Sequence, residues 1–359
     1  MATINEQVLD KLIGHEIDLS RLGNGQVREI VSILNSGDSK IQEELIKALS
    51  EIGDDYSQEA VSKALESAAK ENKSVFEKVR DALAALIIGV IGYEVAYQRG
   101  LLITIIPGAV QEKHPIAEVD EKPIVDLVKE QPFQGRQFDQ WVDGLQQSRI
   151  DSIGATIRNG IVGGLTAAAI IKTIMGTKAE KNADGDLNKF RVQLEAVVVS
   201  AVAVAAMASK EAVTTANKAL ISHVEWVSVL DNRTTTTCII RSGKAYTIGS
   251  HAPIGHKIPW LAGPGKIHFR CRSSYVIVFK SAAQLGIDDD SLGAIMNGIS
   301  PKHTTYAEWL YNQTAEKQDE VLGPTRGRML REGKLKVSAF FNDKGIFLTL
   351  DQLREKLNS

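Results

Sequence analysis

The stretch 224-VEWVSVL-230 decides the fold class, because the residue pattern changes there. Before it, from about Phe190 to Ser222, the pattern predicts one long apolar helix. The stretch itself is rich in β-branched and aromatic residues, which favour strands. Two further short runs of this kind follow, 243-GKAYTIG-249 and 275-YVIVF-279. We therefore predict an α+β protein, with a predominantly helical N-terminal region and a small C-terminal α+β domain of short strands and a hairpin loop.

The first seventy residues have helical spacing of apolar side chains, and 36-SGDS-39 predicts a break between two short helices. Through Glu71 the chain carries 14 acidic and 7 basic residues. Such acidity is typical of a solvated helical surface, and it also suits a region that docks on a basic partner.

Composition shifts predict four segments along the chain. Residues 1–110 form an acidic helical region and a candidate docking surface, and 111–135, with three prolines, form a connector. Residues 136–222 form a helical domain that contains the long helix, and 223–359 form the C-terminal α+β domain.

The whole-chain composition excludes several classes of protein. A net charge of −2 favours neither a nucleic-acid-binding nor a membrane-binding protein as a whole. The N-terminus lacks the pattern of a signal peptide, and two cysteines are too few for a secreted disulfide scaffold. The apolar runs 82–93, 101–106 and 196–208 are shorter than the roughly 20 residues of a membrane span, so we expect buried core helices and no span.

Both cysteines lie in short polar clusters, 231-DNRTTTTC-238 and 268-HFRCRSS-274. Thiolate, imidazole and carboxylate are the ligand types that zinc prefers, so the candidate structural zinc ligands are Asp231, Cys238, His268 and Cys271. In the alternative interpretation the cysteines are small buried hydrophobes and the cluster holds only the fold. We favour this second interpretation, and we identify no catalytic constellation and expect no enzyme.

The segment 231–280 is strongly basic, with eight lysines and arginines against one acid, Asp231. A local basic field of this kind is the electrostatic footprint of a phosphate-binding surface. It is equally a surface complementary to the acidic N-terminal region. The candidate DNA contacts are Arg233, Arg241, Lys244, Lys257, Lys266, Arg270 and Arg272.

Three motifs together resemble those of the phage Mu F-like minor head proteins, also called head-morphogenesis proteins of tailed bacteriophages. They are 226-WVSVLDNRTTTTC-238, 243-GKAY-246 and 267-IHFRCRSS-274. The block 306-YAEWLYNQTAEKQDEVLGPTRGRMLREGKL-335 is similar to one found downstream in many members. The resemblance is specific over about 190–359.

The chain departs from the family pattern at two positions. Thr235 stands where many relatives have the first cysteine of Cys-x-x-Cys, and Ser273 stands where they have the second cysteine of Cys-Arg-Cys. Hydroxyl groups are poor zinc ligands, so these departures weaken the expectation of a metal.

The resemblance implies a structural minor head protein, located at the portal vertex inside the virion and made in the host bacterial cytoplasm. Its expected partners are the portal protein, a scaffolding or major capsid protein, and packaged DNA, and its expected roles are head morphogenesis and DNA packaging or ejection. The rival interpretation is a virion-delivered hydrolase or nuclease that uses Asp231, His251, His256 and His268. It requires those side chains to converge in an open cleft.

Overall fold

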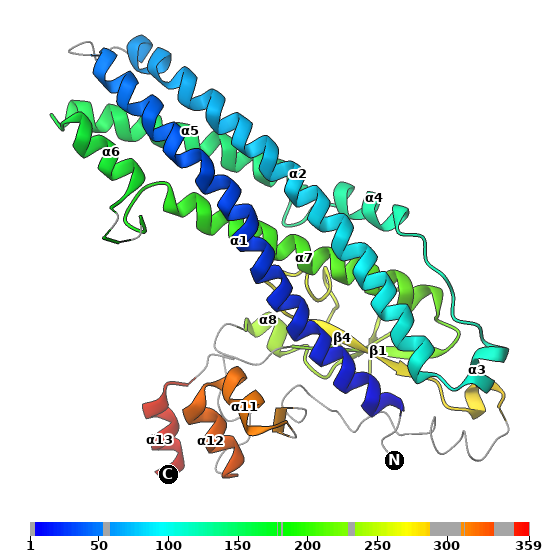
Figure 1. Cartoon of the computed structure of the whole chain (residues 1–359). Helices are drawn as coiled ribbons and strands as arrows, with labels where there is room; N and C mark the ends of the chain where they lie inside the picture. The colour runs from blue at the N-terminus through cyan, green and yellow to red at the C-terminus, as the bar shows by residue number, and fades with distance from the viewer. Residues whose placement is uncertain are drawn as a thin grey trace. The chain divides into compact units, whose positions relative to one another are not determined.

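The computed structural model describes residues 4–52, 58–177, 179–180, 182–228, 234–287, 310–311, 313–333 and 348–358. Within these residues the chain is mostly helical, and its strands form one small antiparallel sheet in the C-terminal part (Figure 1). The predicted α+β class, with a helical N-terminal region and a small C-terminal α+β domain, is therefore confirmed.

The long helices are α1 (Ile4–Ile52), α2 (Gln58–Ile105), α5 (Phe138–Val162) and α7 (Asn188–Ala216). The shorter ones before the sheet are α3 (Gly108–Lys113), α4 (Lys122–Glu130) and α6 (Ala167–Met175). Within and after the sheet come α8 (Thr236–Ile239), the 3-10 helix η1 (Ala283–Leu285), α11 (Ala315–Leu322), α12 (Pro324–Arg331) and α13 (Leu350–Asn358).

Helix α1 continues without a break through 36-SGDS-39, so the prediction of two short helices there is wrong. The reason lies in tertiary contacts. A Cβ atom on Gly37 would overlap Val75 of α2, so this glycine allows a close approach of the two helices. Asp38 directs a buried carboxylate towards two arginines instead of capping a helix. Small and polar residues that usually mark a helix end therefore serve a helix contact and a buried ion pair.

The chain forms two compact units, and neither is contiguous in sequence. Unit 1 comprises Met1–Asp18, Gly92–Glu121 and Ala206–Ser359, and unit 2 comprises Leu19–Ile91 and Lys122–Ala205. This division differs from the sequential domains that we predicted, because α1, α2 and α7 each belong partly to one unit and partly to the other. The predicted connector contains α3 residues and α4, and the predicted change near residue 222 coincides with the start of the sheet.

Unit 1 contains the four-stranded sheet, in the order β3-β2-β1-β4 with every pairing antiparallel. The strands are β1 (Ile221–Val227), β2 (Ala245–Tyr246), β3 (Pro253–Ile254) and β4 (Ser274–Phe279). All six residues of β4 are buried, as expected for a strand covered on both faces. Trp226 of β1 lies opposite Tyr275 of β4, and Val224 lies opposite Tyr246 of β2. The three strands predicted from sequence match β1, β2 and β4.

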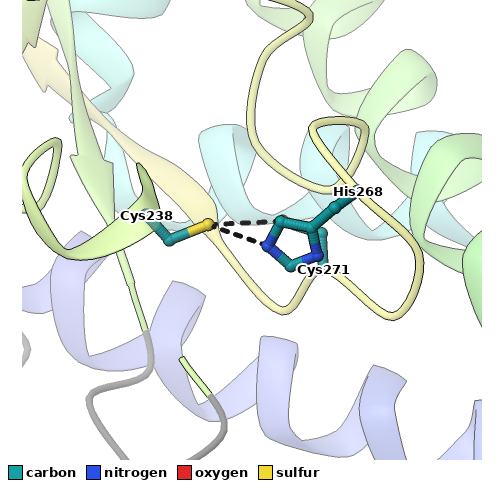
Figure 2. Close-up of side chains that lie close together, drawn as sticks. All are labelled: Cys238, His268 and Cys271. Atoms are coloured by element: carbon teal, nitrogen blue, oxygen red, sulfur yellow. Dashed lines mark hydrogen bonds between the residues drawn. The ribbon is translucent and has the colours of Figure 1, made fainter. Parts of the chain in front are cut away.

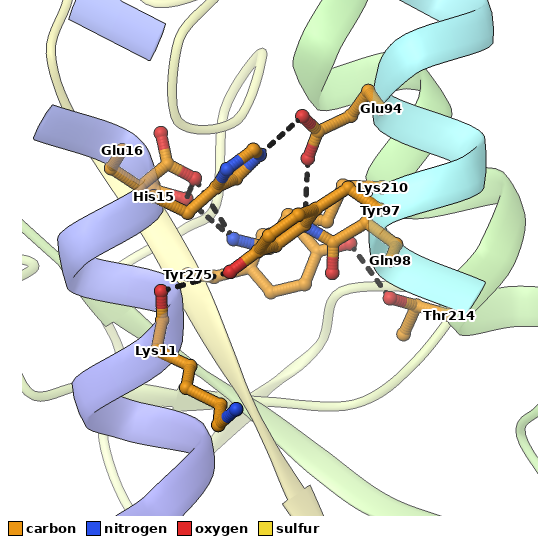
Figure 3. A network of polar contacts seen from close by, with 10 residues as sticks. Lys11, His15, Glu16, Glu94, Tyr97, Gln98, Lys210, Thr214 and Tyr275 are labelled. Carbon is orange, nitrogen blue, oxygen red and sulfur yellow. Dashed lines mark hydrogen bonds and ion pairs between the residues drawn. The ribbon is translucent and has the colours of Figure 1, made fainter. Parts of the chain in front are cut away.

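Unit 1 also buries a polar network between helices that are distant in sequence (Figure 3). His15 Nε2 lies 2.7 Å from Glu94 Oε2, and Gln98 Nε2 donates to the other oxygen of Glu94 at 2.6 Å. Tyr97 stacks on the His15 ring at a centroid distance of 3.4 Å. Both oxygens of a fully buried carboxylate are thus satisfied by side chains of α1 and α2.

The same network reaches the sheet through Lys210 of α7. Its ammonium group donates to Glu16 Oε1 at 2.9 Å and to Ser274 Oγ at 2.8 Å, and it lies 5.0 Å from the centre of the Tyr275 ring. Tyr275 OH bonds Thr214 at 3.0 Å. The ion pair between Glu16 and Lys210 therefore joins α1 to α7, and the hydrogen bond from Lys210 to Ser274 joins α7 to β4.

Among the described helices, α7 is long and apolar enough to cross a membrane by length and composition. Its most apolar window has a mean hydropathy of 1.8, and 67% of that window is buried inside the protein. A core helix of a folded protein and a membrane span both have this length and this apolar composition.

The C-terminal helix α13 begins with a reciprocal pair of hydrogen bonds. Gln352 N donates to Thr349 Oγ1 at 3.2 Å, and Thr349 N donates to Gln352 Oε1 at 2.9 Å. This reciprocal pair is a capping box, which satisfies two backbone N–H groups that have no partner within the helix.

Candidate metal centre

The sheet of unit 1 brings the two cysteine clusters together. Cys238 lies in α8, a single helical turn after β1, whereas His268 and Cys271 lie in the loop that leads into β4. Because β4 runs antiparallel to β1, the start of β4 is adjacent to the end of β1. Residues that are 30 and more positions apart in sequence therefore meet at one edge of the sheet.

The three side chains form a compact group of donor atoms (Figure 2). The two Sγ atoms are 3.8 Å apart, and Cys238 Sγ lies 3.3 Å from His268 Nε2. One ligand atom from each residue lies within 4.8 Å of the others. Both cysteines are buried, and His268 is half-buried.

These distances fit a tetrahedral zinc ion. Zinc–sulfur bonds of about 2.3 Å and a zinc–nitrogen bond of about 2.0 Å place two sulfurs ~3.8 Å apart and a sulfur and a nitrogen ~3.5 Å apart. The measured separations are 3.8 Å and 3.3 Å. The same separations also suit a thiol that donates a hydrogen bond to a thiolate, so the cluster is able to close with or without an ion.

The surroundings of His268 orient its ring. His268 Nδ1 lies 2.9 Å from the carbonyl oxygen of Phe269, which places a proton on Nδ1. Nε2 faces Cys238 Sγ, and it offers a lone pair to an ion when the ring is neutral and donates to the Cys238 thiolate when the ring is protonated. Thr235 Oγ1 lies 3.0 Å from Nε2. The Thr235 hydroxyl therefore stands beside the candidate ligands, where a fourth donor would be needed.

The pKa values of the cluster favour one thiolate. The pKa of Cys238 is lowered, first by the hydrogen bond from Cys271 and then by that from His268, against the opposing effect of burial. The pKa of Cys271 is raised, because it donates to Cys238 and is buried. The pKa of His268 is raised chiefly by its bond with Cys238. Thiolate is the form that binds metals, so Cys238 is the best prepared ligand.

A chain of hydroxyl groups holds the cluster to the sheet, and its central member, Ser228, was not singled out from sequence. Ser228 Oγ accepts from Trp226 Nε1 at 2.9 Å, donates to the carbonyl of Cys238 at 2.8 Å and lies 3.1 Å from Ser273 Oγ. Ser273 is thus used as a hydrogen-bonding partner. The sequence signal was the Trp-x-Ser spacing, which places two side chains on one face of a strand.

The structure brings together three of the four predicted zinc ligands, and Asp231 lies outside the described residues, as does Arg233. Among the other candidate DNA contacts, Arg241 is buried and donates to the carbonyls of Pro259 and Thr237, so its guanidinium is used within the protein. Lys266 pairs with Glu211 at 2.7 Å. Lys257 and Arg270 are exposed, and Lys244 and Arg272 are half-buried.

The histidines of the rival hydrolase interpretation have separate partners. His251 stacks on Trp260 at a centroid distance of 4.4 Å, and burial lowers its pKa. His256 Nε2 lies 2.9 Å from the carbonyl oxygen of Ala245, and the His256 ring meets Tyr246 edge-on. His268 shares none of these contacts. The described contacts therefore give no support to a site shared by the three histidines.

No family model, no curated protein and no solved structure matches this chain.

Proposed function

We propose that this chain is a structural minor head protein of a tailed bacteriophage, which acts at the portal vertex in head morphogenesis. We further propose that the Cys238, His268 and Cys271 cluster is a structural clamp for its C-terminal domain, and that zinc is the ion that fits it. One observation carries the proposal. Described residues of the three motifs 226–238, 243–246 and 267–274 meet at one small sheet, where they contact one another.

The small size of the sheet explains why a link between α8 and the long loop would stabilise this domain. Strands β2 and β3 have two residues each, and the long loop from residue 255 to 273 contains no helix or strand. Short strands supply few hydrogen bonds and little buried apolar area. A metal ion, or a hydrogen bond between the two thiols, that joins α8 to the end of this loop stabilises the folded state, because neither forms in the unfolded chain.

The zinc part is tested by elemental analysis of the purified protein. We expect one zinc per chain in the wild type, and loss of zinc in Cys238→Ser and Cys271→Ser. His223→Ala is the matched control, because His223 is also a half-buried histidine of unit 1, and its ring nitrogens lie near Ser222 and Glu225. Thr235→Cys should add a fourth ligand and slow the release of zinc to a chelator.

A wild-type protein that carries no zinc after purification in zinc-containing buffer would refute the proposed zinc site. In that case Cys238→Ser should still lower the melting temperature, since the thiol hydrogen bonds would alone fasten the loop. If neither zinc nor stability changed in that variant, the clamp itself would be disproved.

The assembly role is tested by co-purification with the portal protein of the same phage. We expect the acidic face of α1 and α2 to contribute, so that a triple variant of exposed acids, Glu29→Gln, Glu43→Gln and Glu66→Gln, retains less portal protein on a column. The control changes exposed acids elsewhere, Glu130→Gln, Asp139→Asn and Glu355→Gln. No co-purification of the wild-type protein would contradict the proposal.

The basic segment is proposed to face packaged DNA, through side chains such as Arg270 and Arg272. Replacing both with glutamate should weaken DNA binding and reduce its salt dependence by about one unit of slope for each phosphate that is no longer neutralised. Lys63→Glu, at an exposed position on α2, is the control. An unchanged salt dependence in the double variant would exclude this face.

A further inference from the structure

Unit 2 contains a cleft of about 1010 Å³ between α1, α6 and the start of α7. Its size is at the upper end of the range for ligand sites in proteins, about 300–1,000 Å³. None of the lining residues belongs to the metal centre or to unit 1. The cleft is therefore a separate feature that the proposed function does not explain.

The deepest charged group of the cleft is Asp38, whose carboxylate is shared by two arginines. Arg191 Nη2 and Arg149 Nη2 each donate to one of its oxygens. Arg149 Nε has no hydrogen-bond partner among the described residues, although the side chain is only 1% exposed. Burial lowers the pKa of Arg149, with Asp38 acting in the opposite direction.

The cluster of Asp38, Arg149 and Arg191 contains two cations and one carboxylate, so it has an excess of one positive charge. Within the described residues Asp38 is the sole carboxylate that pairs with either arginine. A partly buried cation without a counter-charge is costly, and a second anion would relieve that cost. Arg191 lines the cleft, and so does Lys172 of α6, which is exposed. The nearby carboxylate of Asp184 accepts hydrogen bonds from Thr177 and interacts with the charge of Lys172, so Lys172 is the cation of the cleft with a second carboxylate near it.

The walls of the cleft define what else the ligand needs. The lining includes the aliphatic side chains of Ile46, Ile171 and Met175. It is also rich in amide and hydroxyl groups, including Asn35, Gln42, Asn182, Asn188 and Ser39. Among the residues that line the cleft there is no aromatic side chain, so a nucleotide base would have nothing to stack on.

We propose that this cleft binds a short segment of a partner protein that carries a carboxylate and aliphatic side chains. The carboxylate faces Arg191 and Lys172, and the aliphatic side chains lie against Ile46 and Met175. The amide side chains of the lining form hydrogen bonds with the peptide groups. A fatty acid would match the cations and the aliphatic side chains but would leave these amide groups without hydrogen-bond partners. A peptide matches all three features of the cleft.

The experiment uses an array of immobilised hexapeptides in which alanine, leucine, valine and serine are varied around one fixed position, either glutamate, glutamine or lysine. The full-length protein is the probe in solution. We expect the glutamate series to be retained about tenfold more strongly than the glutamine series, and the lysine series not at all. Added salt should reduce the difference.

Two variants locate the binding to the cleft. Lys172→Gln removes an exposed charge without touching the buried cluster, and should weaken retention of the glutamate series about threefold. Lys47→Gln is the matched control, since Lys47 is an exposed lysine of α1 outside the cleft lining. Equal retention of the glutamate and glutamine series, no retention of either, or equal effects of the two lysine variants would overturn the proposal.

Discussion

Each unit of this protein buries a cluster of charged side chains, but the two clusters are balanced differently. In unit 1, Glu94 meets His15 and Glu16 meets Lys210, so that each carboxylate has its own basic partner. In unit 2, a single carboxylate, Asp38, serves two arginines. Both clusters join helices that are far apart in sequence. The difference is that the charges of the first cluster are balanced, whereas the second has one cation in excess and lies beside an open cleft.

This difference indicates different roles for the two clusters. A paired buried cluster costs much to break and offers nothing to a ligand, so it fastens the fold. Two cations that share one carboxylate leave an excess of positive charge, and Arg191, which lines the cleft, is accessible to an incoming anion. Charge balance, more than burial, therefore separates a structural cluster from a binding one.

The largest effect should come from Asp38→Asn. This change leaves two buried guanidinium groups facing each other without a carboxylate. We expect it to lower the free energy of unfolding by an amount near the upper end of ~3–5 kcal/mol, measured by urea denaturation. A loss no greater than that of an exposed substitution such as Asp139→Asn would contradict the buried ion pair.

Lys210→Met should follow, near the lower end of ~3–5 kcal/mol, because Glu16 loses its cation but keeps the hydroxyl of Ser274 and some exposure to water. The control is Lys266→Met, which breaks a less buried pair with Glu211 and should cost only about 1 kcal/mol. Equal stability of the two variants in urea would show that the buried network of unit 1 contributes little to the stability of the fold.

Arg149→Met tests the balance directly. The side chain is as buried as that of Lys210, but its removal leaves Asp38 and Arg191 as a matched pair. We therefore expect a smaller loss of stability, about 1–2 kcal/mol, mainly from the hydrogen bond to Asn72 and from packing. A loss as large as that of Asp38→Asn would show that the second arginine is not in excess.

The smallest effect concerns pH. Burial, assisted by the charge of Glu94, raises the pKa of Tyr97 to about 12 from its usual 10.0. A folded-state pKa above the unfolded one contributes stability that is complete below pH ~10 and is lost as the pH rises towards 12. The absorbance of tyrosinate, compared between the wild type and Tyr97→Phe, should show this titration near pH 12, and Glu94→Gln should move it downwards.

Local patterns predicted the sheet better than they predicted the helices. Strands β1, β2 and β4 follow from β-branched and aromatic runs, and the Cys–His cluster follows from the only two cysteines and a nearby histidine. The break expected at 36-SGDS-39 failed, because Gly37 and Asp38 are explained by α2 and by arginines more than a hundred residues away.

The buried networks had no signal in the sequence at all. His15 and Glu94 are separated by 79 residues, and Glu16 and Ser274 by 258. No periodicity or spacing rule connects such positions, because their proximity is produced by the packing of whole helices.

Helix α7 also bears on how the chain is made. Its apolar window would attract the insertion machinery of a membrane if it remained uncovered on a nascent chain. Synthesis proceeds from the N-terminus, so α1, which contacts α7 through Asp38 and Glu16, has left the ribosome before α7 emerges. Lys210 then meets Glu16 first, and a further 64 residues must be added before Ser274 completes its hydrogen bonds.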